Sequence, residues 1–96
     1  MAGYVIIDLE VTDEALYAQY VQQMAPLIAA HGGKRLANTT EPEVVEGGWT
    51  PRRLALLEFA DGEQARALAN SLEAAELQEM RARCVRNRNV VVFAGL

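Results

Sequence analysis

The stretch YVIIDLEV, residues 4–11, alternates along its whole length. Its odd-numbered residues are all apolar: Val5, Ile7, Leu9 and Val11. Successive side chains of a strand point to opposite faces, so this stretch predicts a strand with one wholly apolar face. The other face also carries apolar groups, Tyr4 and Ile6, beside the acidic Asp8. We therefore expect both faces of this strand to be packed against other parts of the protein or a partner.

A helix is expected directly after this strand. Thr12 reads as its N-cap, and the two acids that follow suit the positive end of a helix dipole. The pair Gly32-Gly33 favours a left-handed stop. Between these points, apolar residues recur at helical spacing: Leu16, Tyr20, Met24, Leu27 and Ile28.

The middle of the chain predicts two more strands. Lys34 to Asn38 and Pro42 to Glu46 read as two halves of an extended arm, with a bend or bulge around residues 39–40. A turn containing Gly47, Gly48 and Pro51 follows. Arg53 to Phe59 then alternates, with Arg53, Ala55, Leu57 and Phe59 on one face and Leu54, Leu56 and Glu58 on the other.

A second helix and a last strand complete the pattern. Asp61 is expected to cap the helix, with Gln64 as its capping-box partner, and Ser71 to cap a further helical turn or two. Val90 to Ala94 predicts the final strand. The order β-α-β-β-α-β favours a single α+β domain over residues 1–96, with a ferredoxin-like, four-stranded antiparallel sheet and both helices on one face.

This arrangement leaves one sheet face uncovered. Tyr4, Ile6, Leu54 and Leu56 would lie on it, and an apolar face of that extent is rarely left in water. A second copy of the sheet, packed about a two-fold axis, is the simplest cover. We therefore expect a homodimer through the sheet face.

Composition limits the classes of partner. The formal charge of -4 opposes binding to nucleic acid or an anionic membrane, and no signal segment or membrane span is expected. The basic group Arg81, Arg83, Arg86 and Arg88 reads as a solvated helix end with a Glu79–Arg83 pair. Cys84 is the only cysteine, which rules out an intrachain disulfide and suits a cytoplasmic location.

Several stretches resemble a known family. These are Gly3-Tyr4-Val5, Tyr17-Ala18-Gln19-Tyr20, Pro26-Leu27-Ile28 with Gly32-Gly33, and the block from Glu41 through Trp49-Thr50-Pro51-Arg52-Arg53 to Phe59. Through these stretches, the sequence resembles the bacterial domain-of-unknown-function family thirteen-thirty, of the dimeric α+β barrel superfamily. Asn70-Ser71-Leu72-Glu73-Ala74 departs from that family, which often has a tyrosine where this chain has Ala74. The resemblance implies a fold and a dimer, and no particular reaction.

Ligand-binding candidates cluster around the lone tryptophan. Trp49 could stack on a planar molecule while Arg52 or Arg53 holds its carboxylate. The alternative is a packed turn in which Trp49 is a lid and Arg52 pairs with a nearby acid. Alternation places Arg52 on the uncovered face and Arg53 on the helix side. Tyr20 is expected in the core, with its hydroxyl at the rim of the helix–sheet cleft.

Catalytic candidates are few. His31 or Glu58 could act as a general base, but His31 also suits a helix C-terminus, and Glu58 or Asp8 suits a salt bridge to Arg52 or to a partner chain. Asp8 and Glu58 are expected to be too far apart to share a proton. With one histidine and one cysteine, no metal site is expected, and no cofactor motif is present.

Three functions remain open from the sequence. The first is binding of a small anionic or planar molecule in the barrel or the helix–sheet cleft. The second is a cofactor-independent enzyme of the monooxygenase or isomerase kind. The third is a structural or regulatory dimer without a ligand.

Overall fold

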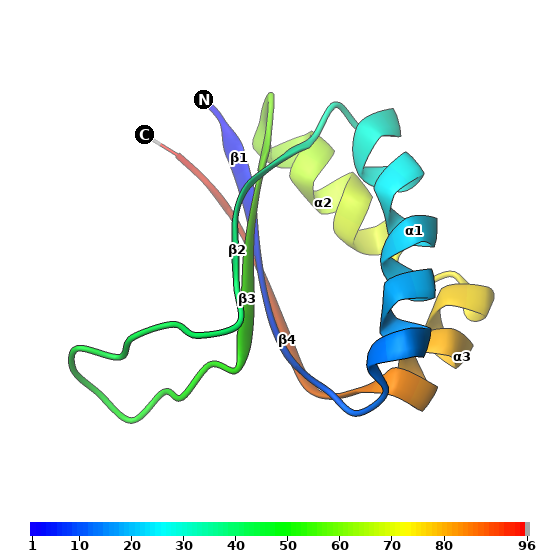
Figure 1. Cartoon of the computed structure of the whole chain (residues 1–96). Coiled ribbons are helices and arrows are strands. Elements are labelled where there is room, and N and C mark those ends of the chain that lie inside the picture. The colour runs from blue at the N-terminus through cyan, green and yellow to red at the C-terminus, as the bar shows by residue number, and fades with distance from the viewer. Residues whose placement is uncertain (96) are drawn as a thin grey trace.

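One layer of the protein is an antiparallel sheet with strand order β2-β3-β1-β4, and the other layer is three helices on one face of that sheet (Figure 1). The structure is a computed structural model that describes residues 1–95. The predicted ferredoxin-like arrangement is confirmed, with the third helix as an extension after the second. The elements are β1 (Gly3–Val11), α1 (Glu14–Ala30), β2 (Lys34–Thr39), β3 (Arg53–Phe59), α2 (Gly62–Ser71), α3 (Ala75–Cys84) and β4 (Val85–Ala94).

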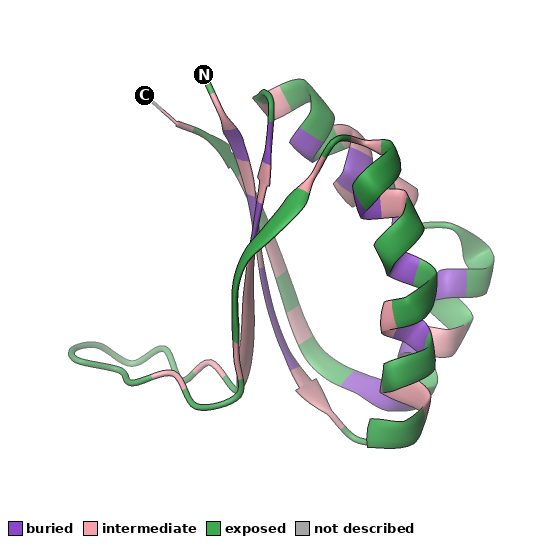
Figure 2. Ribbon diagram, turned by 45° about the horizontal axis from the view of Figure 1, so that its top comes forward, coloured by how far each residue is buried: buried purple, intermediate pink, exposed green. Residues whose placement is uncertain are grey.

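The core lies between the two layers (Figure 2). The apolar face of β1 is buried there as predicted, and β3 adds Leu57 and Phe59. Antiparallel pairing places Tyr4 opposite Glu58 and Asp8 opposite Leu54. Asp8 and Glu58 therefore sit at separate positions along the sheet.

The helix α1 begins one residue later than predicted. Thr12 is not its cap, because the backbone N–H of Thr12 still donates to the carbonyl of Cys84 at 2.8 Å, next to the β1–β4 pairing. Asp13 is the N-cap instead, and its carboxylate accepts from the N–H of Leu16. At the other end the predicted stop is confirmed, because Gly32 has a φ of 73° and lets the N–H of Gly33 return to Ile28.

The predicted N-cap of α2, Asp61, is confirmed, whereas the prediction that Ser71 caps the next helix is wrong. The carboxylate of Asp61 accepts from the N–H of Gln64. Ser71 caps no helix: it ends α2, and its hydroxyl donates to the carbonyl of Leu68 at 2.7 Å. The helix α3 begins at Ala75 without a side-chain cap.

The predicted arm is only half right. Lys34–Thr39 is a strand, but residues 42–46 form no strand, because β3 starts at Arg53 and offers no partner beyond Leu54. The bulge also lies earlier than predicted, between Arg35 and Ala37. Residues 40–52 instead make a loop that projects on the side of the sheet opposite the helices (Figure 1).

The last strand is longer than predicted. It starts at Val85 rather than Val90, and its pairing with β1 shifts register opposite Asp8 and Glu10. Asn87 adopts a positive φ of 53° at this shift, which takes up the extra residue and lets pairing continue to Val11 and Val85.

The sheet face away from the helices stays open in the single chain. Leu36, Val91 and Phe93 are exposed large apolar residues, and the ring of Phe93 stacks on Tyr4 with centroids 5.3 Å apart. Ile6, Leu54 and Leu56 lie between them and are partly exposed. We call these residues, with Tyr4, the open face.

Candidate functional site

A pocket lies between α1 and the sheet. The helix α2 lies directly on β1, β3 and β4, whereas the closest backbone neighbours of α1 are α3 and α2. The space under α1 holds a cavity of about 50 Å³. Its apolar wall comes from both layers: Ile7, Leu57, Val21, Met24 and Ile28. A cavity of this volume has room for a few water molecules, since about 10–15 Å³ of such space holds one, and it is far below the roughly 300 Å³ of a drug-sized site.

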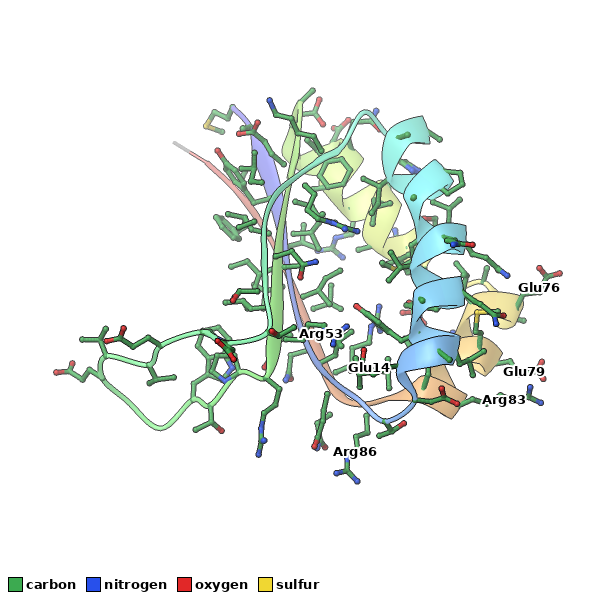
Figure 3. All side chains as sticks on the ribbon, viewed as in Figure 1. Glu14, Arg53, Glu76, Glu79, Arg83 and Arg86 are labelled. Carbon is green, nitrogen blue, oxygen red and sulfur yellow. The ribbon has the colours of Figure 1, made fainter. Side chains whose placement is uncertain are left out.

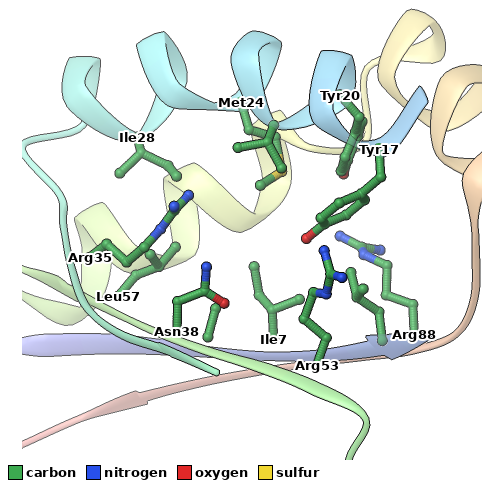
Figure 4. A pocket seen from close by; sticks show the side chains of 13 residues that line it. Ile7, Tyr17, Tyr20, Met24, Ile28, Arg35, Asn38, Arg53, Leu57 and Arg88 are labelled. Atoms are coloured by element: carbon green, nitrogen blue, oxygen red, sulfur yellow. The ribbon is translucent and has the colours of Figure 1, made fainter. Parts of the chain in front are cut away.

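The polar wall of the pocket consists mostly of hydrogen-bond donors. One arginine comes from each of three strands, Arg35 from β2, Arg53 from β3 and Arg88 from β4. Figure 4 shows Arg53 and Arg88 beneath Tyr17 and Tyr20 at one end, and Arg35 beneath Ile28 at the other. No carboxylate side chain lines the pocket. This donor set suits an anion.

The charge of Arg53 is already balanced. One of its terminal nitrogens lies 2.9 Å and 3.0 Å from the two carboxylate oxygens of Glu14, in the first turn of α1 (Figure 3). Its guanidinium also lies 4.8 Å from the centre of the Tyr17 ring, a cation–π distance. Arg53 therefore ties α1 to the sheet and forms part of the pocket wall beside Arg88.

The charge of Arg88 is not balanced in this way. Within residues 1–95 no carboxylate lies within 4.0 Å of its guanidinium, and it donates no hydrogen bond to another side chain or carbonyl. Burial lowers the pKa of Arg88 below its usual value, and the nearby charge of Arg81 lowers it further, while the charge of Glu73 offsets this only in part. The protein thus holds a partly buried cation with no carboxylate at ion-pair distance among residues 1–95.

Arg81 extends this cationic region behind the pocket. It is buried, and its guanidinium donates to the hydroxyl of Tyr20 at 3.1 Å and to the carbonyl of Leu72 at 3.0 Å. Leu72 is the C-cap of α2, so its carbonyl belongs to the negative end of a helix dipole. Since the Tyr20 oxygen accepts from Arg81, the hydrogen of this hydroxyl remains available for a ligand.

Two predicted ligand-binding residues line this pocket and two lie elsewhere. Tyr20 and Arg53 are on its wall. Trp49 and Arg52 lie in the loop at the opposite face, where the buried carboxylate of Asp8 accepts from the indole N–H of Trp49 at 3.0 Å and from the backbone N–H of Arg52 at 3.2 Å. The predicted ion pair between Asp8 and the Arg52 side chain is absent from the described residues.

The predicted catalytic residues lie outside the pocket. The Nδ1–H of His31 donates to the carbonyl of Leu27 at 2.8 Å, at the C-terminal end of α1. Glu58 accepts from the hydroxyl of Tyr4 at 3.1 Å and lies 4.0 Å from Lys34, so the expected salt bridge to Arg52 is wrong within this chain. Across residues 1–95, no three His, Cys, Asp or Glu side chains converge as metal ligands do.

Sequence reasoning missed Arg35, Arg81 and Arg88. Of the basic group, the Glu79–Arg83 pair is confirmed at 3.6 Å, but the expectation that Arg81 is solvated is wrong. Helical spacing already places Arg81 on the stripe of buried Leu77 and Cys84. Alternation along β4 likewise places Arg88 on the helix side with Val90 and Val92, a signal that the group's overall charge obscured.

The family model described as domain of unknown function (DUF1330) matches residues 2–96. The chain belongs to this family. No curated protein matches it. Within the part of the DUF1330 chain that the structure describes, no helix has the length and apolar character to cross a bilayer.

Solved structures confirm the fold of the DUF1330 chain. A protein of unknown function from Rhodopseudomonas palustris is similar with a TM-score of 0.70 and 11% identity, over 99% of this chain and 82% of that one. A dimeric ferredoxin-like protein from Bacteroides fragilis has a TM-score of 0.58 and 13% identity, over 98% and 96%. Another from Thermobifida fusca, also described as dimeric, has a TM-score of 0.58 and 14% identity, over 99% and 92%.

Proposed function

We propose that this DUF1330 protein binds a small organic carboxylate in the pocket under α1, as a homodimer whose subunits meet through the open face. One observation carries the ligand proposal: Arg88 reaches the pocket with no carboxylate partner in residues 1–95, beside a Tyr20 hydroxyl that Arg81 already engages. A bound carboxylate would supply the missing counter-charge and accept from both groups.

The other residues of the pocket limit the charge and the size of the ligand. Its donors oppose a cation, and the apolar residues Ile7, Met24 and Leu57 favour a ligand with a short hydrocarbon part over a fully hydrated inorganic ion. The cavity volume of about 50 Å³ limits that part to a short chain. Short-chain carboxylates meet all three requirements.

Isothermal titration calorimetry of the purified protein tests this proposal. Butyrate is the probe, with butanol and butylamine as a neutral and a cationic control of equal chain length. Butyrate should bind, and the two controls should not. Arg88→Met should weaken butyrate binding about tenfold or more, since a charge-assisted hydrogen bond is worth about 1.5–3 kcal/mol.

Arg83→Gln is the matched control variant, because it removes one positive charge from the exposed surface of α3. It should leave butyrate affinity unchanged. If both variants lost butyrate affinity equally, the loss would come from the overall charge of the protein and not from the position of Arg88. If the native protein did not bind butyrate at all, the proposed function would be refuted.

The homodimer rests on the open face. Its residues Leu56, Val91 and Phe93 form an apolar surface on β3 and the edge strand β4, and two solved structures of the same fold are described as dimeric. Two such sheets packed face to face would complete the α+β barrel. Analytical ultracentrifugation should give a dimer for the native protein and a monomer for Leu56→Glu. Ala82→Glu, which places the same charge on an exposed site of α3, should remain dimeric.

A further inference from the structure

The bulge in β2 directs two polar side chains toward the pocket. Arg35 pairs with Leu57 and Asn38 pairs with Ala55, and both partners are on the helix side of β3. In a regular strand, side chains three residues apart point to opposite faces. The extra residue between Arg35 and Ala37 brings Arg35 and Asn38 onto the same face, as bulges beside binding sites often do.

Arg35 and Asn38 stand together at the end of the pocket remote from Arg88 (Figure 4). We refer to Arg35 and Asn38 as the mouth pair.

Neither member of the mouth pair has a partner of its own. No carboxylate lies within 4.0 Å of the Arg35 guanidinium among residues 1–95, and the Asn38 amide makes no hydrogen bond with these residues. The adjacent cation differs, because Lys34 faces the other side of the sheet and lies 4.0 Å from Glu58. The planar fork of an arginine beside an amide donor suits a carboxylate.

We propose that the mouth pair holds a second acidic group, so that the ligand is a short dicarboxylate with one carboxylate at Arg88 and the other at Arg35. This inference rests on the proposed function and specifies its substrate class. Through the sheet register, Arg35 lies level with Leu57, Val5 and Val92. Arg88 comes four residues before Val92 on β4, three strands from β2, which puts the Cα atoms of Arg35 and Arg88 about 20 Å apart at roughly 3.3 Å per residue and about 4.8 Å per strand. Two long side chains that reach inward across that span leave a gap suited to a short dicarboxylate, with Met24 and Leu57 flanking its carbon chain.

Calorimetry with succinate and butyrate tests the second group, since these acids have chains of equal length and differ by one carboxylate. Succinate should bind about tenfold more tightly or better, as expected for one added charge-assisted contact. Arg35→Gln should bring the ratio of the two affinities close to one. Asn38→Leu should reduce the same ratio by a smaller factor, and Arg83→Gln should not change it.

The outcomes separate this inference from the proposed function. Equal affinity for succinate and butyrate in the native protein would overturn the dicarboxylate and leave the carboxylate site intact. A preference for succinate that persists in Arg35→Gln would overturn the role of the mouth pair. If sulfate bound as tightly as succinate, the protein would recognise a double charge on one compact ion and not two separate carboxylates. That result would also overturn the role of the mouth pair. Failure of both acids to bind would overturn the proposed function together with this inference.

Discussion

Replacing Arg88 with methionine should stabilise the ligand-free protein and remove its ligand. Arg88 donates no hydrogen bond within residues 1–95 and has no carboxylate partner there, so its removal leaves no acceptor unsatisfied. Methionine keeps most of the apolar stem and removes a charge that burial and Arg81 both disfavour. We expect the free energy of unfolding to rise by about 1 kcal/mol, which corresponds to about 4–8 °C in Tm for a domain of this size.

Arg53→Met is the contrast, because it removes the same type of charge from the same pocket. Arg53 pairs with Glu14, whose side chain is 70% exposed, and this contact is worth about 0.2–1 kcal/mol. Its position over the Tyr17 ring adds about 0.5–1 kcal/mol. Arg53→Met should therefore lower the free energy of unfolding by about 0.7–2 kcal/mol, opposite in sign to Arg88→Met.

Urea denaturation at one fixed protein concentration, followed by circular dichroism, measures both effects. Butyrate at about one hundred times the dissociation constant of the native protein should add about 2.7 kcal/mol to the native protein and at most about 1.4 kcal/mol to Arg88→Met, whose affinity is at least about tenfold weaker, so the order of stability reverses. If Arg88→Met were destabilised as much as Arg53→Met without ligand, Arg88 would have a stabilising partner in the free protein. That result would refute the argument that Arg88 is a cation without a carboxylate partner in the ligand-free protein.

Three further predictions concern other parts of the chain. Asp8→Ala should lower the free energy of unfolding by about 2 kcal/mol through lost hydrogen bonds and shift the fluorescence of Trp49, whereas unchanged emission would contradict the observed indole contact. The Cys84 thiol is buried and burial raises its pKa, so Ellman's reagent should label it only in urea; prompt labelling of the native protein would contradict this. The hydrogen bond from Arg86 is the main cause that lowers the pKa of Glu10, so its stabilising effect should be present above the usual glutamate pKa and disappear as pH falls through the lowered value. The stability gap between native protein and Glu10→Gln should therefore close in acid, and a gap independent of pH would disprove this linkage.

Local sequence patterns were enough to predict the fold and part of the candidate site. The alternation of residues 4–11 and 53–59 predicted both central strands and their buried faces. The same alternation placed Arg53 on the helix side, where it lines the pocket. These features depend on side-chain direction along one strand, which the sequence records directly.

Features that depend on pairing between strands were not predictable in the same way. The bulge between Arg35 and Ala37 has no glycine or proline to mark it, and a one-residue shift reverses which side chains face the pocket. The contact between Asp8 and Trp49 joins residues far apart in sequence. The three pocket arginines come from three different strands, so only the folded sheet brings them together.

A crystal structure of the protein with 4-bromobutyrate tests the central claim most directly, because anomalous scattering locates the bromine without prior assumptions. The account predicts bromine between α1 and the sheet, with the carboxylate within hydrogen-bonding distance of Arg88 and the Tyr20 hydroxyl. Bromine found only on the open face or on the outer surface, with the pocket under α1 unoccupied by the acid, would contradict it.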